Sequence, residues 1–570
     1  MINWRSAMET AQWLTAPPRP EAGILASELG IPPAIAQVLA NRGISNAEDA
    51  RKFLFGTLDN LADPYLFNDM AKAVERLQAA IERKEKVLIF GDYDVDGVLS
   101  VVILMRALRN LGAEVDYYIP ERLKEGYGIK DEHLQVVEER RAGLVISVDC
   151  GIKAVSFARK AKARGVDVII TDHHRQGDEL PPATAILNPV LGDSGYPFRG
   201  LAGVGVVFKL LQALLTKAGK PALLSSYAKL VAIGTIADVA ELRGENRLLV
   251  KEGLRGLGSV SNRGLKSLLD ECRLAGRKIT EGDVGFRIGP RINAAGRMGA
   301  ADSAVKLFFA DSIEEAAELA ARLSGYNETR QQEEDRIFGE ALRQVQESSL
   351  DSRYKILVLG SESWHRGVIG IVASKLKEYF YRPVVLLTYE DGKASGSGRS
   401  ISEFSLIDCL DACRDVFLDY GGHTLAVGCS LARERVSEFR ERANAFAEAR
   451  LSADDLRRKV RIDAALSLAE IDGPFIKSYL LLSPFGVGNP KPLFHSAQVE
   501  VWSAPQLIQG KHLKFIARQD GRSFEALGWD KADRLQEIRR GSKISLAFSL
   551  QSSTYLGEEK YALCIEDIGK

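Results

Sequence analysis

The sequence predicts an α/β protein of several domains, with a parallel-sheet lobe, a second α/β lobe joined to it by a long helix, and a small C-terminal β-barrel. Three observations predict this fold class. Helical segments alternate with short apolar segments from residue 71 onwards, a highly charged helical stretch follows at 312–349, and short strand-like segments fill the chain from 460. In addition, 570 residues are too many for one hydrophobic core.

The first lobe is predicted from its alternating helical and strand patterns. After a Pro-rich start, residues 1–60 are helical in pattern. The strand candidates that follow are VLIFGD, EVDYYIP, LVISVD, VDVIITDHH and AILNP, with helix candidates such as AVERLQAAIERKEK between them. Strands that alternate with helices form βαβ units and a parallel sheet. The apolar runs are continuous, as expected of strands that are buried on both faces.

The rest of the chain is predicted as a connecting helix, a second α/β lobe and a barrel. The segments QVEVWSAPQLIQ, HLKFIARQ, RSFEALGW, KISLAFSLQSS and KYALCIEDI favour a five-stranded barrel of the oligonucleotide-binding (OB) type, with a β-sandwich as the alternative. We therefore expect a helical segment at 1–60, a sheet lobe at 61–310, a connecting helix at 311–349, a second α/β lobe at 350–455 and an OB-like barrel at 456–570.

The overall composition is that of an ordinary globular protein, with 46% hydrophobic and 27% charged residues. Lys and Arg together number 76, as do Asp and Glu, so the net charge neither favours nor excludes a nucleic acid partner. The stretch from Arg243 to Arg297 is locally basic, with 12 Lys and Arg against 6 Asp and Glu. This excess is either a solvated face or the footprint of a polyanion.

Cysteine usage and the apolar runs bear on where the protein works. The six cysteines include no C-x-x-C pair, which favours reduced thiols over disulfides or a zinc site. The N-terminus has no charged segment followed by an apolar run, so we expect no signal peptide. No apolar stretch reaches the ~20 residues of a membrane helix. We expect a cytoplasmic protein without a membrane segment.

The stretch VLIFGDYDVDG carries the first chemical signal. An apolar strand runs into Asp92, Asp94 and Asp96, three carboxylates at alternate positions. In an extended segment alternate side chains point the same way, so we expect these three to crowd one patch, where like charges raise each other's pKa. A divalent cation such as Mg²⁺ or Mn²⁺ would relieve the repulsion. The alternative is a solvated Asp-rich turn.

Three later segments favour the metal. Asp149 follows the apolar run LVISV, and His173 and His174 follow VDVIITD. Asp238 follows the apolar stretch VAIGTIA, which we also interpret as a strand that ends in a ligand. Ligand sites of open α/β sheets lie beyond the carboxyl ends of the strands. Each residue alone has an ordinary explanation, such as a helix N-cap or a packed histidine. Together they predict one metal site.

The residue types of this site predict its chemistry. A set with more carboxylates than imidazoles suits Mn²⁺ or Mg²⁺ better than Zn²⁺. There are enough ligands for two ions with one bridging carboxylate, and two ions ~3.5–4 Å apart form a clamp for in-line displacement at phosphorus. No convincing Ser/His/Asp or Cys/His set is present. The sequence therefore predicts two-metal phosphoester hydrolysis.

These motifs resemble a known family. GDYDVDG, SVDCG, TDHH and GTIADV resemble the four signature motifs of the DHH phosphoesterase superfamily. The later stretches FRIGPRINAAGRM, SWHRGVIGIVASKL, GSGRS, GGHTLAVG and LSPFGVGNPKPLF extend the resemblance to its bacterial single-strand-specific exonucleases, from about residue 75 to the C-terminus. The resemblance implies a DHH lobe, a long connecting helix, a DHH-associated lobe and an OB-type domain.

The resemblance also implies a function. It implies a Mn²⁺- or Mg²⁺-dependent 5′→3′ exodeoxyribonuclease that digests single-stranded DNA to mononucleotides in DNA repair and recombination. Implied protein partners are a single-strand-binding protein and a RecQ-type helicase.

The resemblance assigns the metal site residue by residue. It implies Asp94, Asp96, Asp149, His173 and Asp238 as ligands and catalytic residues, with Asp92 and His174 in or beside the same shell and Asp149 as the bridging carboxylate. Smaller members of the superfamily have a histidine four residues before the first ligand Asp. Here that position is Phe90, which matches the nuclease branch.

The resemblance places substrate contacts in both lobes. It implies Ser397, Arg399 and His423 as phosphate-binding residues of the second lobe, and Arg291, Asn293 and Arg297 as contacts from the first. In the barrel, Lys511, His512, Lys514, Phe515 and Trp529 are candidates for contacts with a single strand, although core packing is favoured for the aromatic residues.

Two other functions remain open from the sequence. The first is another superfamily enzyme, acting on oligoribonucleotides, cyclic dinucleotides or pyrophosphate; such enzymes are expected to be shorter and to have no OB-like domain. The second is a catalytically silent DNA-binding homologue, which would have lost ligand carboxylates. Every motif carboxylate is present in this chain.

Overall fold

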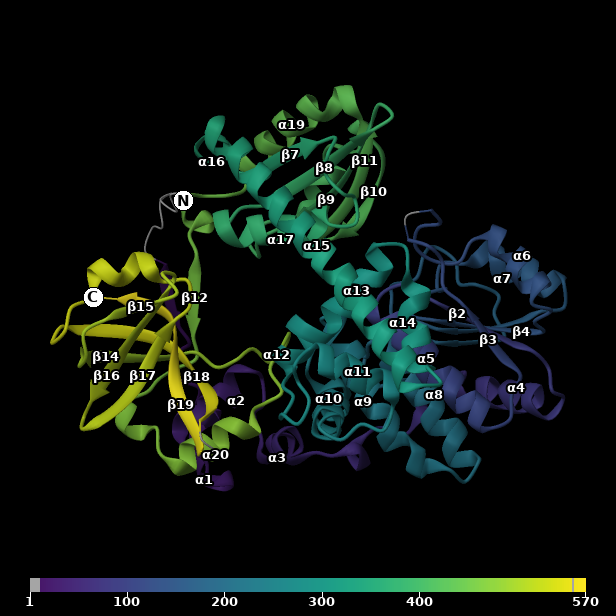
Figure 1. Ribbon diagram of the computed structural model, residues 1–570, viewed down its shortest axis with the longest axis horizontal. Helices are drawn as coiled ribbons and strands as arrows, with labels where there is room; N and C mark the ends of the chain where they lie inside the picture. The colour runs from purple at the N-terminus through teal and green to yellow at the C-terminus, as the bar shows by residue number, and fades with distance from the viewer. Residues whose placement is uncertain (1–10, 123, 556–557, 570) are drawn as a thin grey trace. The chain divides into compact units, whose positions relative to one another are not determined.

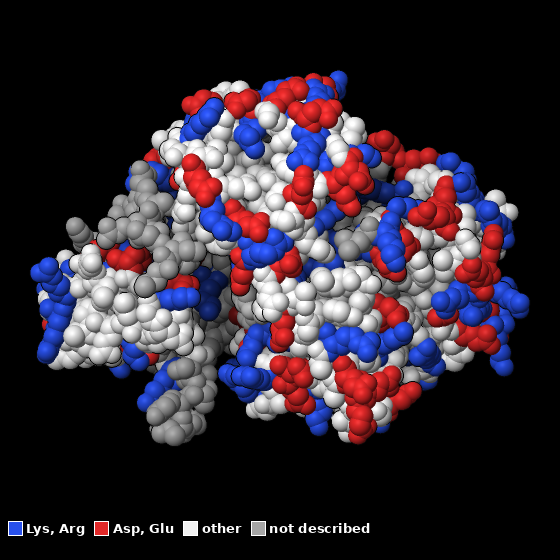
Figure 2. All heavy atoms as spheres, turned by 45° about the horizontal axis from the view of Figure 1, so that its top comes forward, with Lys and Arg blue, Asp and Glu red and all other residues white. Residues whose placement is uncertain are grey.

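The computed structural model describes residues 11–122, 124–555 and 558–569, and it divides into two compact units (Figure 1). The first unit comprises Gly325–Arg461 together with the segment up to Leu14, and the second comprises Thr15–Ser324 together with Ile462–Lys570. Acidic and basic side chains are interspersed over the face seen in Figure 2, in keeping with the zero net charge.

A five-stranded parallel sheet forms the centre of the second unit, in the order β3-β2-β4-β5-β6. Its strands are β2 (Val87–Gly91), β3 (Val115–Tyr118), β4 (Leu144–Val148), β5 (Asp167–Thr171) and β6 (Ala185–Leu187). Every residue of β2 and β4 is buried, which explains their continuous apolar runs. The predicted parallel sheet is confirmed.

Helices surround this sheet, and α4 shows why they form. Its buried residues recur every three or four positions, from Met70 through Val74 to Leu77, which places one apolar stripe against the core. The βαβ helices are α4 (Met70–Glu82), α5 (Val95–Asn110), α6 (Leu134–Glu139) and α7 (Val155–Ala163). A helical layer follows, in which α5 packs against both α8 and α9. Its members are α8 (Gly203–Lys217), α9 (Leu224–Ala237), α10 (Gly244–Leu257), α11 (Arg263–Glu271), α12 (Glu281–Asp283), the π-helix η5 (Val284–Ile288), α13 (Gly289–Arg297) and α14 (Ala301–Phe308).

A closed five-stranded barrel occupies the C-terminal part of the same unit. Strand β14 pairs with both β18 and β16, which closes the order β14-β18-β19-β17-β16 and confirms the predicted OB-like barrel. Its elements are β13 (Ala464–Ala465), α20 (Gly473–Leu481), β14 (Phe494–Val501), β15 (Gln506–Ile508), β16 (His512–Gln519), β17 (Arg522–Gly528), β18 (Lys543–Tyr555) and β19 (Glu558–Gly569).

The N-terminal helices share one hydrophobic core with this barrel. Leu25 and Ile35 belong to the same buried cluster as Phe475 and Phe515. These helices are α1 (Pro20–Leu29), α2 (Pro33–Asn41) and α3 (Ala47–Phe55). The predicted helical pattern before residue 60 is thus confirmed from Pro20 onwards, whereas residues 1–10 lie outside the described part of the chain. A short strand that the sequence did not predict, β1 (Gln12–Thr15), pairs with β12 (Lys459–Ile462).

The first unit is a mixed sheet flanked by helices. The sheet has the order β10-β11-β9-β8-β7, with β7 and β8 parallel and the other pairs antiparallel. Helix α15 (Ile313–Glu347) is continuous and confirms the predicted long connecting helix. The other elements are α16 (Leu350–Arg353), β7 (Leu357–Ser361), α17 (Ile369–Phe380), β8 (Val384–Glu390), β9 (Lys393–Arg399), α18 (Leu406–Asp411), β10 (Phe417–His423), β11 (Ala426–Ala432) and α19 (Val436–Glu448).

Two local predictions are wrong. The segment before Asp238 is helix α9, so this residue follows a helix rather than a strand. The Asp-rich stretch is not extended either, because β2 ends at Gly91 and α5 begins at Val95. Before Asp238, a buried helix has the same continuous apolar run as a buried strand. At the Asp-rich stretch, Asp94 caps α5 and so ends the extended conformation. Among the described residues, no helix combines the length and apolar character needed to cross a membrane.

Candidate metal centre

The Asp-rich stretch forms the turn from β2 into α5. Asp94 is the N-cap of the helix, and one of its carboxylate oxygens accepts a hydrogen bond of 3.1 Å from the Gly97 backbone N–H. Asp96 lies on the first helical turn. A Cβ on Gly97 would lie 2.4 Å from the carbonyl oxygen of Asp92, so this close turn requires glycine. The carboxylates therefore come together around a turn, not along a strand.

Asp96 is held by the N-terminus of another helix. Its two carboxylate oxygens accept hydrogen bonds of 2.7 and 2.8 Å from the backbone N–H groups of Gly203 and Val204, where α8 begins. The residue is only 1% exposed. Burial raises the pKa of Asp96 to about 7, and the neighbouring Asp94 charge acts in the same direction. The N-terminus of α8 thus orients the Asp96 carboxylate, but it does not cancel the negative charge of the neighbouring Asp94.

Asp149 lies immediately beyond β4, with a φ of 59°, in the left-handed region. Its Oδ1 is 3.1 Å from Nε2 of His173, yet the two atoms do not form a hydrogen bond, and neither has a hydrogen-bond partner among the described residues. Burial, followed by the charges of the other aspartates, raises the pKa of Asp149 well above its usual range. Two adjacent buried atoms with free lone pairs are what a shared cation requires.

The residues that follow β5 divide into a candidate ligand and its support. Burial lowers the pKa of His173 to about 4, so its imidazole is neutral at physiological pH, as a metal ligand must be. Asp172 accepts hydrogen bonds from the backbone N–H groups of Ile152, His173 and His174 and lies 2.8 Å from Nδ1 of His174. Burial alone would raise the pKa of Asp172, but the bonds from His174 hold it below its usual range.

His174 is oriented through its Nδ1 atom. The carboxylate of Asp172 and the hydroxyl of Tyr127, at 3.1 Å, both contact this nitrogen. The same tyrosine hydroxyl donates to the backbone carbonyl of Asp149 at 3.3 Å. Burial opposes the charged form of His174, yet the bond to Asp172 raises its pKa overall. A ring fixed at Nδ1 leaves Nε2 as the atom that can face an ion.

Asp238 completes the cluster from the C-terminal end of α9. Its Oδ2 lies 3.9 Å from Nε2 of His173, and burial raises the pKa of Asp238 to about 9. The ligand atoms form three groups, in each of which the atoms lie within 4.8 Å of one another, and Asp149 and His173 each belong to two of these groups. These groups are Asp92–Asp94–Asp149, Asp96–His173–Asp238 and Asp149–His173–His174. All seven predicted metal-site residues are thus brought together.

This donor set fits two divalent cations. Oδ1 of Asp92 and of Asp149 and Nε2 of His173 are buried polar atoms without a hydrogen-bond partner among the described residues. Four carboxylates with raised pKa values, those of Asp92, Asp96, Asp149 and Asp238, lie together, and none forms an ion pair with a Lys or Arg of the described part of the chain. Hard oxygen ligands in excess over imidazole suit Mn²⁺ or Mg²⁺.

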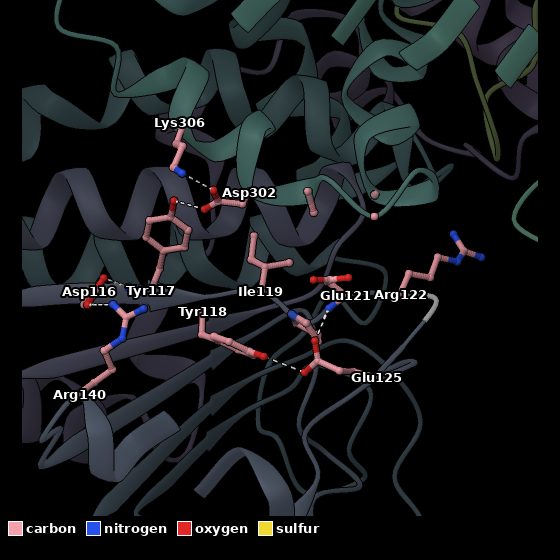
Figure 3. A pocket seen from close by; sticks show the side chains of 14 residues that line it. Asp116, Tyr117, Tyr118, Ile119, Glu121, Arg122, Glu125, Arg140, Asp302 and Lys306 are labelled. Atoms are coloured by element: carbon pink, nitrogen blue, oxygen red, sulfur yellow. Dashed lines mark hydrogen bonds and ion pairs between the residues drawn. The ribbon is translucent and has the colours of Figure 1, made fainter. Parts of the chain in front are cut away.

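A pocket of about 480 Å³ lies close to the metal centre, at the carboxyl end of β3 and beside the turn from α13 into α14 (Figure 3). Most of its charged side chains are paired within the wall, as Arg140 is with Asp116 and Lys306 with Asp302. Arg122 extends away from these pairs, and its guanidinium lies 5.0 Å from the ring centre of Tyr93, between Asp92 and Asp94 in the chain. Sequence reasoning missed Arg122.

The residues predicted to contact substrate from the parallel-sheet lobe lie on α13, in the second unit. Two of them form hydrogen bonds with other residues of the protein. Asn293 accepts a hydrogen bond of 3.3 Å from the backbone N–H of Val95, so it braces the Asp-rich turn. Arg291 donates to the Ser324 hydroxyl at 3.0 Å and to the Arg287 carbonyl at 2.7 Å. Arg297 ends the same helix, close enough to influence the pKa of Tyr93. The helix therefore supports the metal-binding turn.

The three residues predicted to bind phosphate from the second α/β lobe lie in the first unit, on one face of its sheet. His423 is paired with Ala426, and Ala426 with Arg399, across β10, β11 and β9. Ser397, two residues before Arg399, shares that face. A Cβ on Gly370, at the start of α17, would lie 3.0 Å from the Ser397 hydroxyl and 3.3 Å from a nitrogen of Arg399. The fold thus places Ser397 and Arg399 at a helix N-terminus, a favourable position for an anion.

The barrel contacts are partly corrected. Phe515 is 1% exposed and belongs to the core, so it is not available for base stacking. Trp529 is 47% exposed and packs edge-on against His512. The structure adds Trp502, which is 46% exposed with the Arg518 guanidinium 4.1 Å from its ring centre. Of the two predicted lysines, Lys511 is exposed and Lys514 is paired with Glu525.

Comparison with known proteins gives three family matches along the chain. Residues 86–235 match the DHH family N-terminal domain, residues 353–449 the DHHA1 domain, and residues 462–567 the RecJ OB domain. The first match contains every residue of the metal centre except Asp238, which follows three residues later.

The relatives and solved structures agree. The chain is 39% identical to the single-stranded-DNA-specific exonuclease RecJ of Bacillus subtilis over 95% of its length and 69% of the relative's. It is 33% identical to that of Escherichia coli, covering 94% of this chain and 96% of the relative. The structure matches Thermus thermophilus RecJ in complex with Mn²⁺ with a TM-score of 0.82 at 32% identity, over 98% of this chain and 79% of that one. A Mg²⁺ complex from the same organism matches with a TM-score of 0.76, at 31% identity over 98% and 78% of the two chains. On these grounds the chain belongs to the RecJ family of DHH phosphoesterases.

Proposed function

We propose that this protein is a single-stranded-DNA-specific exonuclease that hydrolyses phosphodiester bonds with two divalent cations, Mn²⁺ or Mg²⁺. The observation that carries the proposal is the position of Asp149, whose carboxylate belongs to two of the three ligand groups and has a buried oxygen without a hydrogen-bond partner in the described part of the chain. A carboxylate shared between two ligand groups is the arrangement that a two-metal centre requires.

The ligands divide around Asp149. Asp92 and Asp94 would hold one ion with it, whereas Asp96, His173 and Asp238, assisted by His174, would hold the other. When bound, such ions supply Lewis acidity toward the phosphate and toward the attacking water. Asp172 and Tyr127 fix the ring of His174, and the N-terminus of α8 fixes Asp96. Asp94, Asp96, Asp149, His173, His174 and Asp238 form the proposed catalytic set.

Substrate contacts are proposed in each unit. In the first unit, Ser397, Arg399 and His423 present a hydroxyl, a guanidinium and an imidazole on one sheet face, which suits a phosphate group. In the second unit, Arg291, Asn293 and Arg297 lie on helix α13, which contacts the metal-binding turn through Asn293. The exposed Trp502 and Trp529 of the barrel offer faces for base stacking.

Polarity and biological role rest on the family resemblance. It supports digestion from the 5′ end, a role in DNA repair and recombination, a cytoplasmic location, and cooperation with a single-strand-binding protein and a RecQ-type helicase. The barrel argues against the smaller superfamily enzymes that act on oligoribonucleotides or cyclic dinucleotides. The intact ligand cluster argues against a catalytically silent homologue.

The proposal is tested with a single-stranded DNA oligomer labelled at its 3′ end. With Mn²⁺ the label should appear in progressively shorter products as nucleotides leave the 5′ end, and a blunt duplex should stay intact. EDTA and the Asp149→Ala variant should abolish the reaction. The Asp270→Asn variant, which removes an exposed carboxylate on α11, should digest normally. An intact oligomer with wild-type protein and Mn²⁺ would overturn the proposal.

A further inference from the structure

A second pocket in the second unit, lined by none of the predicted site residues, is strongly basic. It has a volume of about 260 Å³ and lies between the N-terminal helical segment and the first turn of α10. Four of its nine lining side chains are basic and one is acidic. The basic residues are Arg42, Lys52, Arg243 and Arg247. Two of them come from the basic stretch between residues 243 and 297 that the metal centre leaves unexplained.

Two of these guanidinium groups are buried and have no hydrogen-bonded carboxylate partner among the residues that the structure describes. Arg247, 1% exposed, donates to the backbone carbonyls of Phe53, Leu481, Leu482, Ser483 and Pro484. Arg42, 8% exposed, donates to the Asn489 side chain and the Pro490 carbonyl, and its Nε has no acceptor among the described residues. All these acceptors are neutral, so neither guanidinium donates to a charged group.

Nearby carboxylates offset these two positive charges only in part. Asp49, the acidic lining residue, is held by the side chain of Asn46, which caps helix α3. Burial lowers the pKa of Arg42 to about 10, with Asp463 opposing the shift and Arg243 adding to it. Burial and then Arg42 lower the pKa of Arg247 to about 9, against a smaller opposing effect of Glu281. The charged forms are therefore under strain that an anion would relieve.

The pocket also contains a helix N-terminus. Helix α10 has 14 residues, and its N-cap, Arg243, makes no side-chain capping hydrogen bond. Gly244, the first residue of the helix, lines the pocket. The first N–H groups of a helix and its dipole both favour an anion at this end. Arg42, with its unpartnered Nε, lines the same space.

We propose that this pocket is a binding site for a phosphate group, separate from the metal centre. All five N–H groups of Arg247 donate to carbonyls, so this residue contributes its positive charge only. Nε of Arg42 lacks an acceptor among the described residues, and the exposed Lys52 side chain adds a charged donor at the rim. The apolar lining residues Ile44, Phe53 and Leu248 provide a surface for the group that carries the phosphate. The volume suits a phosphate ester rather than a long segment of polymer. The phosphate belongs either to a DNA strand or to a free mononucleotide.

The site can be tested by hydrogen–deuterium exchange of the full-length protein in EDTA, with inorganic phosphate, dTMP or a (dT)₁₂ oligomer as the probe. Binding should slow exchange in residues 42–53 and 243–248. The Lys52→Glu variant should raise the probe concentration for half-maximal protection several-fold. The Arg51→Glu variant makes the same charge change on the next residue of α3, which does not line the pocket, and should behave like wild type.

The three probes distinguish the sources of the phosphate. Protection by (dT)₁₂ at concentrations where dTMP gives none would assign the site to a DNA strand, whereas protection by dTMP and inorganic phosphate alone would assign it to a free anion. No protection by any probe, or equal protection of both charge-reversal variants, would overturn the proposal. Because the measurement needs no metal, its failure would leave the exonuclease assay unaffected.

Discussion

Oδ1 of Asp149 and Nε2 of His173 lie 3.1 Å apart beyond the ends of β4 and β5, and neither has a hydrogen-bond partner among the described residues. Without a cation, a buried carboxylate in this position is costly, because burial and the neighbouring aspartates raise its pKa well above the usual range. The same feature that favours a metal ion therefore destabilises the metal-free protein. The first two predictions follow from this.

Replacing Asp149 by Asn should separate activity from stability. The variant should lose about 10²-fold or more in kcat, because the loss of a metal-bridging carboxylate removes several kcal/mol of Lewis-acid stabilisation. In EDTA it should melt at a higher temperature than wild type, since the buried side chain no longer has to be charged or to take up a proton on folding, and Mn²⁺ should raise its melting temperature less. Thermal melts and single-strand digestion measure both effects. A variant that melts below wild type in EDTA would contradict this account, and Asp270→Asn provides the control.

The stability of the metal-free protein should fall as pH rises. Burial raises the pKa of Asp96 to about 7 and that of Asp238 to about 9. Above the ordinary carboxyl pKa, near 4, the folded protein therefore holds protons that the unfolded chain has released, and this advantage disappears as the pH passes the two folded-state values. Melting temperatures in EDTA should decline between about pH 5 and pH 9.

Asp238→Asn isolates this effect from the titration of other groups. The variant should lose much of the decline above about pH 7, because it removes the carboxyl with the higher of these two pKa values. With saturating Mn²⁺ the wild-type protein should also lose the decline, since the ions compensate the charges. A wild-type melting temperature in EDTA that rises over this range would contradict the assigned direction.

Arg399 should act in substrate binding more than in the chemical step. Its guanidinium shares a sheet face with His423 and lies beside the Ser397 hydroxyl, to which it donates at 3.1 Å. Arg399→Ala should raise KM for single-stranded DNA about tenfold, the effect of losing one charge-assisted hydrogen bond, with a smaller change in kcat. Lys393→Ala, an exposed position at the other end of β9, should leave both constants unchanged. An equal fall in kcat would place Arg399 in the transition state instead.

The sequence predicted the ligands better than the elements that carry them. Asp149 and His173 were found because parallel strands end at one sheet edge. Asp238 was found for the wrong reason, since the buried helix α9 has the same apolar run as a strand. Tyr127 and Arg122 lie in an irregular loop without periodicity, and their contacts with His174 and Tyr93 arise only in the tertiary fold.

In the barrel, the alternation of apolar and polar residues along a strand predicts which side chains are buried better than the residue types alone do. Leu513, Phe515 and Ala517 are buried on β16, whereas Lys514 between them faces outward to Glu525. The two-residue period could have placed Phe515 inside. The exposed Trp502 and Trp529 lie where β14 and β17 end, beyond the reach of the same argument.

Gly203 should be required for the geometry of the metal centre. A Cβ at this position would lie 2.6 Å from Oδ1 and 2.8 Å from Cβ of Asp149, at the point where the Gly203 N–H donates to Asp96. Gly203→Ala must therefore move either the carboxylate of Asp149 or the start of α8. Misplacement of a catalytic group by about 1 Å can cost about 10²-fold in rate, so kcat should fall by that order.

The matched control is Gly339→Ala on helix α15, where an added Cβ would meet no atom within 4 Å. This change should preserve activity and stabilise the helix slightly, because alanine has the higher helix propensity. Both variants should keep the wild-type circular dichroism spectrum. Full activity of Gly203→Ala would contradict this prediction. It would show that the Asp149 carboxylate can move without loss of function and is not held in one position between two ligand groups.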